Sequence, residues 1–251
     1  MTNSEIDILK TEAGTTLYHL GPSLSQGSLP TLFYFALTGE ESLNLLPFSK
    51  VPKLLSSHNC RVFSLTLPYH TNDLPHTKSM KKWAEALSEG RNFISPFIEQ
   101  CLEAIDFVIK QGYTDPARLA TAGISRGGYI ASALAAKEPR VSFILGFAPV
   151  TDLTVLQTFD FLKEDPFSVV AMKDQLISKQ IKYYIGNRDE RVGTEHCIES
   201  LLSVINAAAN SGIRSPKIEL VMYPSIGFKG HGTPDKIFSD GASWLKNKLI
   251  D

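Results

Sequence analysis

Short, continuous runs of apolar and β-branched residues recur along this chain, and most are followed by a segment with helical character. The runs cover residues 31–36, 61–67, 118–122, 141–147, 181–185 and 217–222. Runs without polar alternation are typical of parallel strands whose two faces are both covered. Parallel strands need crossover connections, which helices usually supply. The sequence therefore predicts an α/β fold with a mainly parallel central sheet and helices on both faces.

The ends of the predicted sheet and its helices can also be placed. Residues 6–10 and 15–20 flank Glu12-Ala13-Gly14 and predict an N-terminal antiparallel hairpin. Helices are expected over residues 45–57 (interrupted near Pro47 and Pro52), 79–88, 92–111, 129–136, 194–209 and 234–250. Residues 151–179 are expected to be part helix and part loop. Since no linker, repeat or low-complexity segment interrupts this order, a single domain over residues 1–251 is predicted.

The motif Gly123-x-Ser125-x-Gly127 lies between the run 118–122 and a small-residue helical segment that begins at Tyr129. A strand, a sharp turn and a helix are the context in which G-x-S-x-G forms a nucleophile elbow. The turn exposes the serine hydroxyl above the sheet, and a Cβ at either glycine would crowd the neighbouring strand and helix. Ser125 is therefore the predicted nucleophile.

Two further polar residues follow later strands. Asp189 comes after the run 181–185, and His231 comes after the run 217–222. Reactive side chains of α/β folds lie beyond the carboxyl ends of the strands, and Ser…Asp…His is the chain order of an elbow hydrolase. We expect His231 to act as the general base for Ser125, and Asp189 to fix the imidazole and stabilise its protonated form.

Alternatives to this assignment stay open at the level of sequence. Asp152 follows the run 141–147 and competes for the role of the acid, although it also suits a helix N-cap. Glu190 is a weaker competitor. Asn187-Arg188-Asp189 is also good turn sequence, and His231 is compatible with a loop histidine that has no catalytic task.

Taken together, Gly123-Ile124-Ser125-Arg126-Gly127-Gly128, Gly186-x-x-Asp189-x-x-Val192 and Gly230-His231-Gly232 resemble the α/β-hydrolase superfamily. The resemblance covers roughly residues 30–250 and is strongest to dienelactone-hydrolase and prolyl-oligopeptidase-like serine esterases with a minimal cap or none. It implies a serine hydrolase that needs no cofactor and no metal. Prolyl-oligopeptidase-like enzymes usually carry an extra N-terminal domain, for which we expect no room here.

The same resemblance assigns an oxyanion hole to the backbone N–H groups of Leu37 and Arg126. Many members carry His-Gly where this chain has Phe35-Ala36, directly before Leu37. The donor is main chain, so the departure does not by itself remove it, but losing one donor would cost about 10²–10³ in rate. Tyr69, His70, Ile226 and Phe228 also follow strand ends and are candidates for the substrate pocket.

Composition restricts the partners. The chain has 25 basic and 26 acidic residues, a net charge of −1 and no basic block, which gives no indication of nucleic acid or an anionic membrane as a partner. No apolar stretch is long enough for a transmembrane helix, and the first ten residues do not look like a signal peptide. The three cysteines have no paired spacing, which favours a reducing, cytoplasmic setting.

The function expected from sequence is hydrolysis of small carboxylic esters through an acyl-enzyme, with a small-molecule ester substrate as the predicted partner. A serine peptidase or thioesterase of the same fold is the nearest alternative in chemistry. A non-catalytic ligand-binding protein is the alternative from another class, because fold alone does not fix function.

Overall fold

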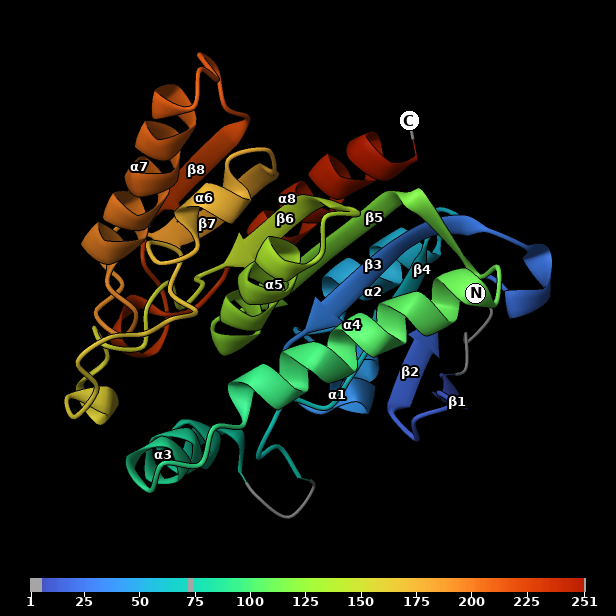
Figure 1. Cartoon of the computed structure of the whole chain (residues 1–251), viewed down its shortest axis with the longest axis horizontal. Helices are drawn as coiled ribbons and strands as arrows, with labels where there is room; N and C mark the ends of the chain where they lie inside the picture. The colour runs from blue at the N-terminus through green and yellow to red at the C-terminus, as the bar shows by residue number, and fades with distance from the viewer. Residues whose placement is uncertain (1–5, 72–74, 251) are drawn as a thin grey trace.

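The computed structural model describes residues 6–71 and 75–250, and an eight-stranded sheet forms its centre (Figure 1). From one edge to the other the strands are β1 (Asp7–Lys10), β2 (Thr16–Leu20), β4 (Arg61–Ser64), β3 (Leu29–Phe35), β5 (Thr114–Ile124), β6 (Val141–Phe147), β7 (Gln180–Gly186) and β8 (Ile218–Tyr223). The six strands β4, β3, β5, β6, β7 and β8 run parallel to one another. Strand β2 is antiparallel to both of its neighbours, β1 and β4. The predicted sheet and its N-terminal hairpin are confirmed.

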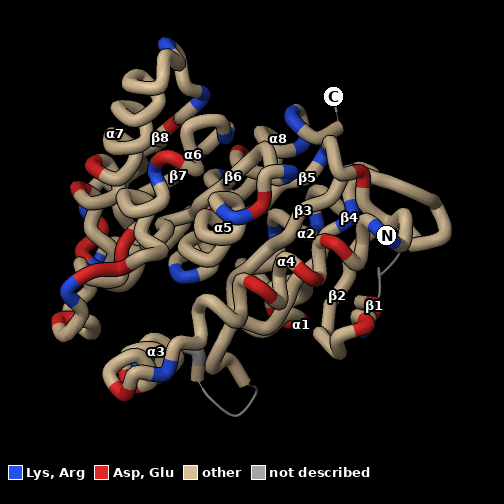
Figure 2. Tube along the Cα trace, in the orientation of Figure 1, with Lys and Arg blue, Asp and Glu red and all other residues tan. Residues whose placement is uncertain are grey.

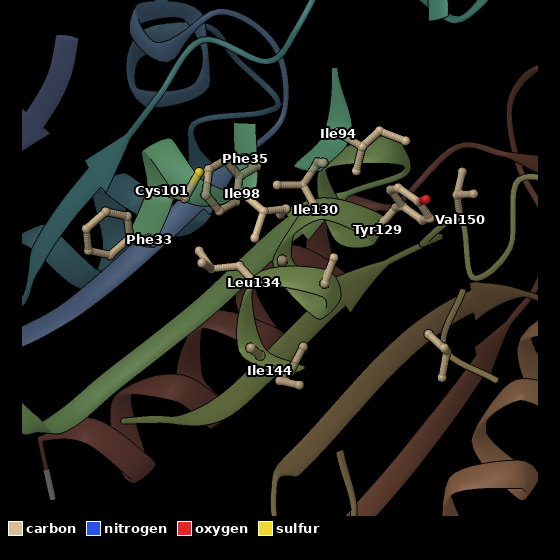
Figure 3. Packing of buried hydrophobic residues seen from close by; sticks show 14 of the residues in the cluster. Phe33, Phe35, Ile94, Ile98, Cys101, Tyr129, Ile130, Leu134, Ile144 and Val150 are labelled. Atoms are coloured by element: carbon tan, nitrogen blue, oxygen red, sulfur yellow. The ribbon is translucent and has the colours of Figure 1, made fainter. Parts of the chain in front are cut away.

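Helices cover both faces of this sheet and enclose two cores. One core lies between the sheet and α3 (His76–Ser88), α4 (Ile94–Lys110), α5 (Arg126–Lys137), α6 (Lys173–Leu176) and α7 (Thr194–Asn210). The other lies beneath α1 (Gly39–Asn44), α2 (Lys50–Ser56) and α8 (Asp235–Leu249). Strand β3 serves both cores, since Phe33 and Phe35 face the first and Leu32 and Tyr34 the second. Figure 3 shows Phe33 and Phe35 among side chains of α4 and α5.

Central strands are buried on both sides, as continuous apolar runs require. Every residue of β6 except Ser142 is buried, and its predicted bounds, 141–147, match the structure. The edge strand β1 is largely exposed. Strand β5 is longer than the predicted 118–122, because Thr114 pairs with Leu29 before a shift in register joins Leu119 to Thr31.

The helix predicted over 45–57 is wrong in its first half. Residues 39–44 form α1 instead, where Thr38 and Glu41 make a reciprocal capping box. Residues 45–49 form a turn with a cis Leu46–Pro47 peptide, and α2 begins at Lys50 with Pro52 in its first turn. Proline is tolerated there because the first N–H groups of a helix have no acceptor within it.

The remaining predicted helices differ from the structure by a few residues at most. Helix α3 begins at His76 rather than at residue 79. Residues 72–74 of the loop before it lie outside the described residues. The same holds for residues 1–5, the first half of the N-terminal segment that was predicted not to be a signal peptide. The prediction of one domain over residues 1–251 stays a prediction.

Residues 148–179 connect β6 to β7 and contain only the short η2 (Gln157–Phe159) and α6, in agreement with a minimal cap. Asp165 fastens this segment to the nucleophile helix. Its carboxylate accepts hydrogen bonds from the Tyr129 hydroxyl at 2.8 Å and from the N–H groups of Leu153 and Phe167 at 2.8 and 2.9 Å. Burial nevertheless raises the pKa of Asp165, although these three donors oppose the shift.

Acidic and basic residues are interspersed along the whole described trace, in agreement with the near-zero net charge (Figure 2). Among the helices of the described residues, none combines the length and apolar character that a membrane span requires.

Candidate active site

Ser125 stands at the turn between β5 and α5, where sequence analysis placed the nucleophile. Its backbone has φ 53° and ψ −117°, a conformation that is strained for a residue with a side chain. The turn is fixed by its own main chain: the Ser125 N–H donates to the Phe147 carbonyl at 2.9 Å, and the Ser125 carbonyl accepts from Gly128 and Val150 at 3.0 and 3.1 Å. The strained conformation of Ser125 is thus held by β6, by the segment after β6 and by the first turn of α5.

The glycines of the motif are there because two backbones approach each other. A Cβ on Gly123 would lie 2.2 Å from the Gly127 carbonyl carbon, and one on Gly127 would lie 1.9 Å from the Phe35 carbonyl oxygen. Neither contact is possible for a real carbon atom, and backbone cannot move aside as a flexible side chain can. The elbow therefore depends on both glycines.

The structure brings Ser125, His231 and Asp189 together. His231 Nε2 lies 2.9 Å from Ser125 Oγ, and His231 Nδ1 lies 2.7 Å from Asp189 Oδ2. A carboxylate can only accept, so Nδ1 carries the proton and Nε2 is the acceptor for the serine hydroxyl. The Asp189 side chain has no exposed area and that of His231 is 10 % exposed. The arrangement is a hydrogen-bonded relay that ends at a hydroxyl.

Asp189 is held as a carboxylate by its surroundings. Burial alone would raise its pKa, but the hydrogen bond and charge of His231, together with the amides of Val192 and Arg191, lower it below the usual range. Those amides donate to Oδ1 at 3.1 and 2.9 Å, so Asp189 is a turn residue and the histidine's partner at once. Thr194 fixes the turn by donating to the Gly186 carbonyl and accepting from the Asp189 N–H.

The loops that carry Asp189 and His231 are joined to each other. The Glu190 N–H donates to the Lys229 carbonyl at 2.9 Å, and a Cβ on Gly230 would lie 2.1 Å from the Arg188 carbonyl oxygen. Gly230 thus permits close packing on the Asp189 loop, and Gly232 packs against Ile226.

Neither competing acid reaches His231. Asp152 Oδ1 accepts from the N–H and hydroxyl of Thr154, both at 2.7 Å, and forms a local turn rather than a helix cap. Glu190 is exposed and forms an ion pair with Arg188 at 3.3 Å. Asp189 is the carboxylate that the described structure places on the imidazole.

The predicted oxyanion donors differ in their surroundings. Arg126 is the first residue of α5 and directly follows Ser125. The Leu37 N–H donates to Ser42 Oγ at 2.9 Å, and the Ala36 N–H donates to the same oxygen at 3.2 Å. The Leu37 amide is therefore directed at α1, the helix that carries Ser42. This helix was not predicted from the sequence.

A pocket of about 270 Å³ opens at Ser125. Its apolar wall comes from Val150, Val155, Leu156, Val192 and Met80, and its polar lining includes Gln157, Thr158, Glu190, Arg191 and Lys229. Among the described residues that line this pocket, Phe228 is the predicted pocket residue that is present, and Tyr69 and His70 are absent from the lining. Tyr69 packs edge-on against Phe93, and the buried His70 places Nδ1 3.0 Å from the Pro68 carbonyl. Ile226 is exposed and pairs with the His231 loop instead.

Val155 and Leu156 were not predicted to line the pocket, because an irregular segment gives no periodic signal, and neither was Met80 of α3. Among the residues that the structure describes, no group of three or more His, Cys, Asp or Glu side chains is arranged to hold a metal ion.

Residues 81–196 match the sequence profile of the prolyl oligopeptidase family, a region that includes Ser125 and Asp189 and ends before His231. A search of curated proteins found no match. Among solved structures, dipeptidyl peptidase 4 of Porphyromonas gingivalis is similar over 98 % of this chain with a TM-score of 0.68 and 17 % identity. This chain spans 35 % of that protein's length.

Two similar structures have nearly the same length as this chain. TT1662 of Thermus thermophilus is 17 % identical, with a TM-score of 0.70 over 98 % of this chain and 99 % of its own. A Klebsiella pneumoniae protein assigned as a dienelactone hydrolase is 15 % identical, with a TM-score of 0.69 over 98 % of both chains. The chain has the α/β-hydrolase fold, and the resemblance to dienelactone hydrolases and prolyl oligopeptidases is confirmed.

Proposed function

We propose that this α/β-hydrolase-fold chain is a serine hydrolase that cleaves small carboxylic esters through an acyl-enzyme. The observation that carries the proposal is the continuous hydrogen-bonded relay from Asp189 through His231 to Ser125 Oγ, at 2.7 and 2.9 Å. The resemblance to the prolyl oligopeptidase profile supports the hydrolase class. Each member of the relay has a distinct task.

Ser125 Oγ attacks the ester carbonyl while His231 Nε2 removes its proton, because a serine hydroxyl is a weak nucleophile without an adjacent base. Asp189 accepts from Nδ1 throughout and stabilises the imidazolium. The tetrahedral intermediate collapses when His231 returns the proton to the leaving alkoxide, which leaves Ser125 acylated. A water molecule, deprotonated by His231, then attacks the acyl carbonyl. His231 returns this proton to Ser125 Oγ as the second tetrahedral intermediate collapses, which releases the acid and free Ser125.

The oxyanion region favours esters over peptides. The amide of Arg126 follows the nucleophile directly, while the Leu37 amide is engaged by Ser42. One fewer donor costs about 10²–10³ in rate. An ester has a better leaving group than an amide and needs less stabilisation of the tetrahedral intermediate. The apolar wall of Val150, Val155 and Leu156 suits a short acyl chain.

Peptide hydrolysis is the alternative that a specific observation favours, since the family profile and the dipeptidyl peptidase similarity both name peptidases. Thioester hydrolysis would use the same three residues, and the same experiment tests it. Cytoplasmic location stays a prediction; the buried free thiols of Cys60, Cys101 and Cys197 do not test it.

The test compares p-nitrophenyl acetate and butyrate with a dipeptide p-nitroanilide and an acyl thioester, for wild type and Ser125→Ala. We expect turnover of the esters, little of the anilide and none by Ser125→Ala. Ser239→Ala, which removes an exposed hydroxyl of α8, is the matched control and should retain full activity. Labelling by a serine-directed fluorophosphonate should be lost in Ser125→Ala alone. A folded wild type that neither labels nor turns over would make the protein a binder rather than an enzyme.

A further inference from the structure

The rim of the Ser125 pocket differs in charge from its apolar wall. Arg191, Lys229 and Glu190 lie in the lining, on the loops that also carry Asp189 and His231. Glu190 forms an ion pair with Arg188 at 3.3 Å, which offsets its charge. Arg191 and Lys229 are exposed, so the lining that they share with Val150, Val155 and Leu156 has an excess of positive charge.

The backbone segments that carry both cations are held by hydrogen bonds. The Arg191 N–H donates to Asp189 Oδ1 at 2.9 Å, so its loop is fixed by the acid of the relay. Lys229 takes a left-handed conformation, φ 52°, and its carbonyl accepts from the Glu190 N–H at 2.9 Å. The two residues therefore face the same pocket from joined loops.

Arg126 adds a third cation beside the nucleophile. It is half-buried and directly follows Ser125. Burial lowers the pKa of Arg126 to about 10, and the nearby charge of Arg191 contributes to that decrease. Positive charge therefore lies beside the nucleophile as well as on the loops of Arg191 and Lys229.

We propose that Arg191 and Lys229 bind a carboxylate of the substrate, so that the preferred substrates are esters whose acyl chain ends in an acidic group. This inference rests on the proposed function, because it names the substrate class of the same site. A guanidinium and an ammonium at one rim match a carboxylate oxygen pair, and Val150, Val155 and Leu156 would contact the methylenes between the carboxylate and the ester.

The test uses two esters that differ in one group: p-nitrophenyl valerate and mono-p-nitrophenyl glutarate, in which a carboxylate replaces the terminal methyl. The measured quantity is the ratio of kcat/KM for glutarate to that for valerate. Wild type should prefer the glutarate ester, and the double variant Arg191→Gln/Lys229→Gln should lower the ratio by about tenfold, the effect of losing charge-assisted contacts at a partly exposed site.

Two further variants control for general charge. Glu190→Gln removes the rim carboxylate and should raise the ratio. Arg214→Gln removes an exposed cation just before β8, at the opposite end of the sheet, and should leave the ratio unchanged. A ratio that stays within about twofold of wild type in the double variant would overturn the carboxylate site, since both proposed contacts are removed at once.

A binding measurement separates this inference from the proposed function. Titration calorimetry with Ser125→Ala compares monomethyl glutarate with methyl valerate, and needs no turnover. Tighter binding of the glutarate that is lost in Ser125→Ala/Arg191→Gln/Lys229→Gln supports the carboxylate site even if wild type hydrolyses neither nitrophenyl ester. Equal affinity for the two compounds, or a glutarate affinity that the substitutions of Arg191 and Lys229 do not change, overturns the carboxylate site.

Discussion

Arg61 is a fully buried arginine at the amino end of β4, and replacing it by methionine should destabilise the protein severely without affecting the active site. Its guanidinium donates to the carbonyls of Pro22, Ser23, Gly27 and Tyr113, at 3.2 Å to Pro22 and 2.6 Å to Ser23. These contacts fasten the loop between β2 and β3 to the start of β5. The loop lies at the end of the sheet opposite to Ser125.

The size of the effect follows from what methionine leaves behind. Methionine fills much of the same volume but donates nothing, so four carbonyls lose a charged partner. Hydrogen bonds to charged groups contribute about 1.5–3 kcal/mol each, but the residues around Gly27 are exposed, and water can replace some of them. We expect a net loss of about 3–5 kcal/mol, as for other broken buried charge contacts.

Guanidinium denaturation measures this loss, and Arg118→Met is the matched control. Arg118 pairs with the carboxylate of Asp115 at 2.6 Å, but it is 44 % exposed, and its removal should cost less than about 1 kcal/mol. In thermal unfolding, Arg61→Met should lower Tm by about 6–20 °C. The kcat/KM of the folded variant should equal that of wild type. If Arg61→Met loses no more stability than Arg118→Met, the role assigned to the buried guanidinium is wrong.

Three further outcomes test the site and the cap. Gly127→Ala should fail to form the elbow, because its Cβ would lie 1.9 Å from the Phe35 carbonyl oxygen; fluorophosphonate labelling and circular dichroism will show whether reactivity or folding is lost. Asp189→Asn should keep the fold but lower kcat by about 10⁴, since the amide favours the wrong imidazole tautomer; unchanged kcat would remove Asp189 from the relay. Asp165 has a raised pKa in the folded state, so its contribution to stability is complete below about pH 3.9 and is lost as the pH rises through the folded value. Wild type should therefore gain stability relative to Asp165→Asn as the pH falls from 8 toward 4 in denaturation curves, and a constant difference would contradict this.

The parts of the site that sequence could place are those set by the sheet. Ser125, Asp189 and His231 each follow a strand whose apolar run is unmistakable, and parallel strands end at one edge, so their meeting could be foreseen. The glycines around Ser125 could be interpreted for the same reason, because the crowding they relieve is a property of the strand-turn-helix itself.

What sequence could not place depends on contacts between segments without a regular period. The Leu37 amide is engaged by Ser42 because α1, a six-residue helix, begins just after it, and so short a helix has no periodic signature. Val155 and Leu156 reach the pocket because Asp165 ties their segment to Tyr129, a contact between a loop carboxylate and a helix hydroxyl. Neither distance along the chain nor composition encodes such a pairing.

The joining of the two loops at Glu190 and Lys229 has a mechanical consequence. Asp189 and His231 belong to one unit at the β7–β8 side of the sheet, whereas Ser125 is anchored among β5 and β6. A hinge-like displacement between those halves would stretch the bond from imidazole to hydroxyl while leaving the bond from imidazole to carboxylate intact. On warming, the protein should thus lose the hydrogen bond between His231 and Ser125 first. It should become inactive while it is still folded and while His231 still contacts Asp189.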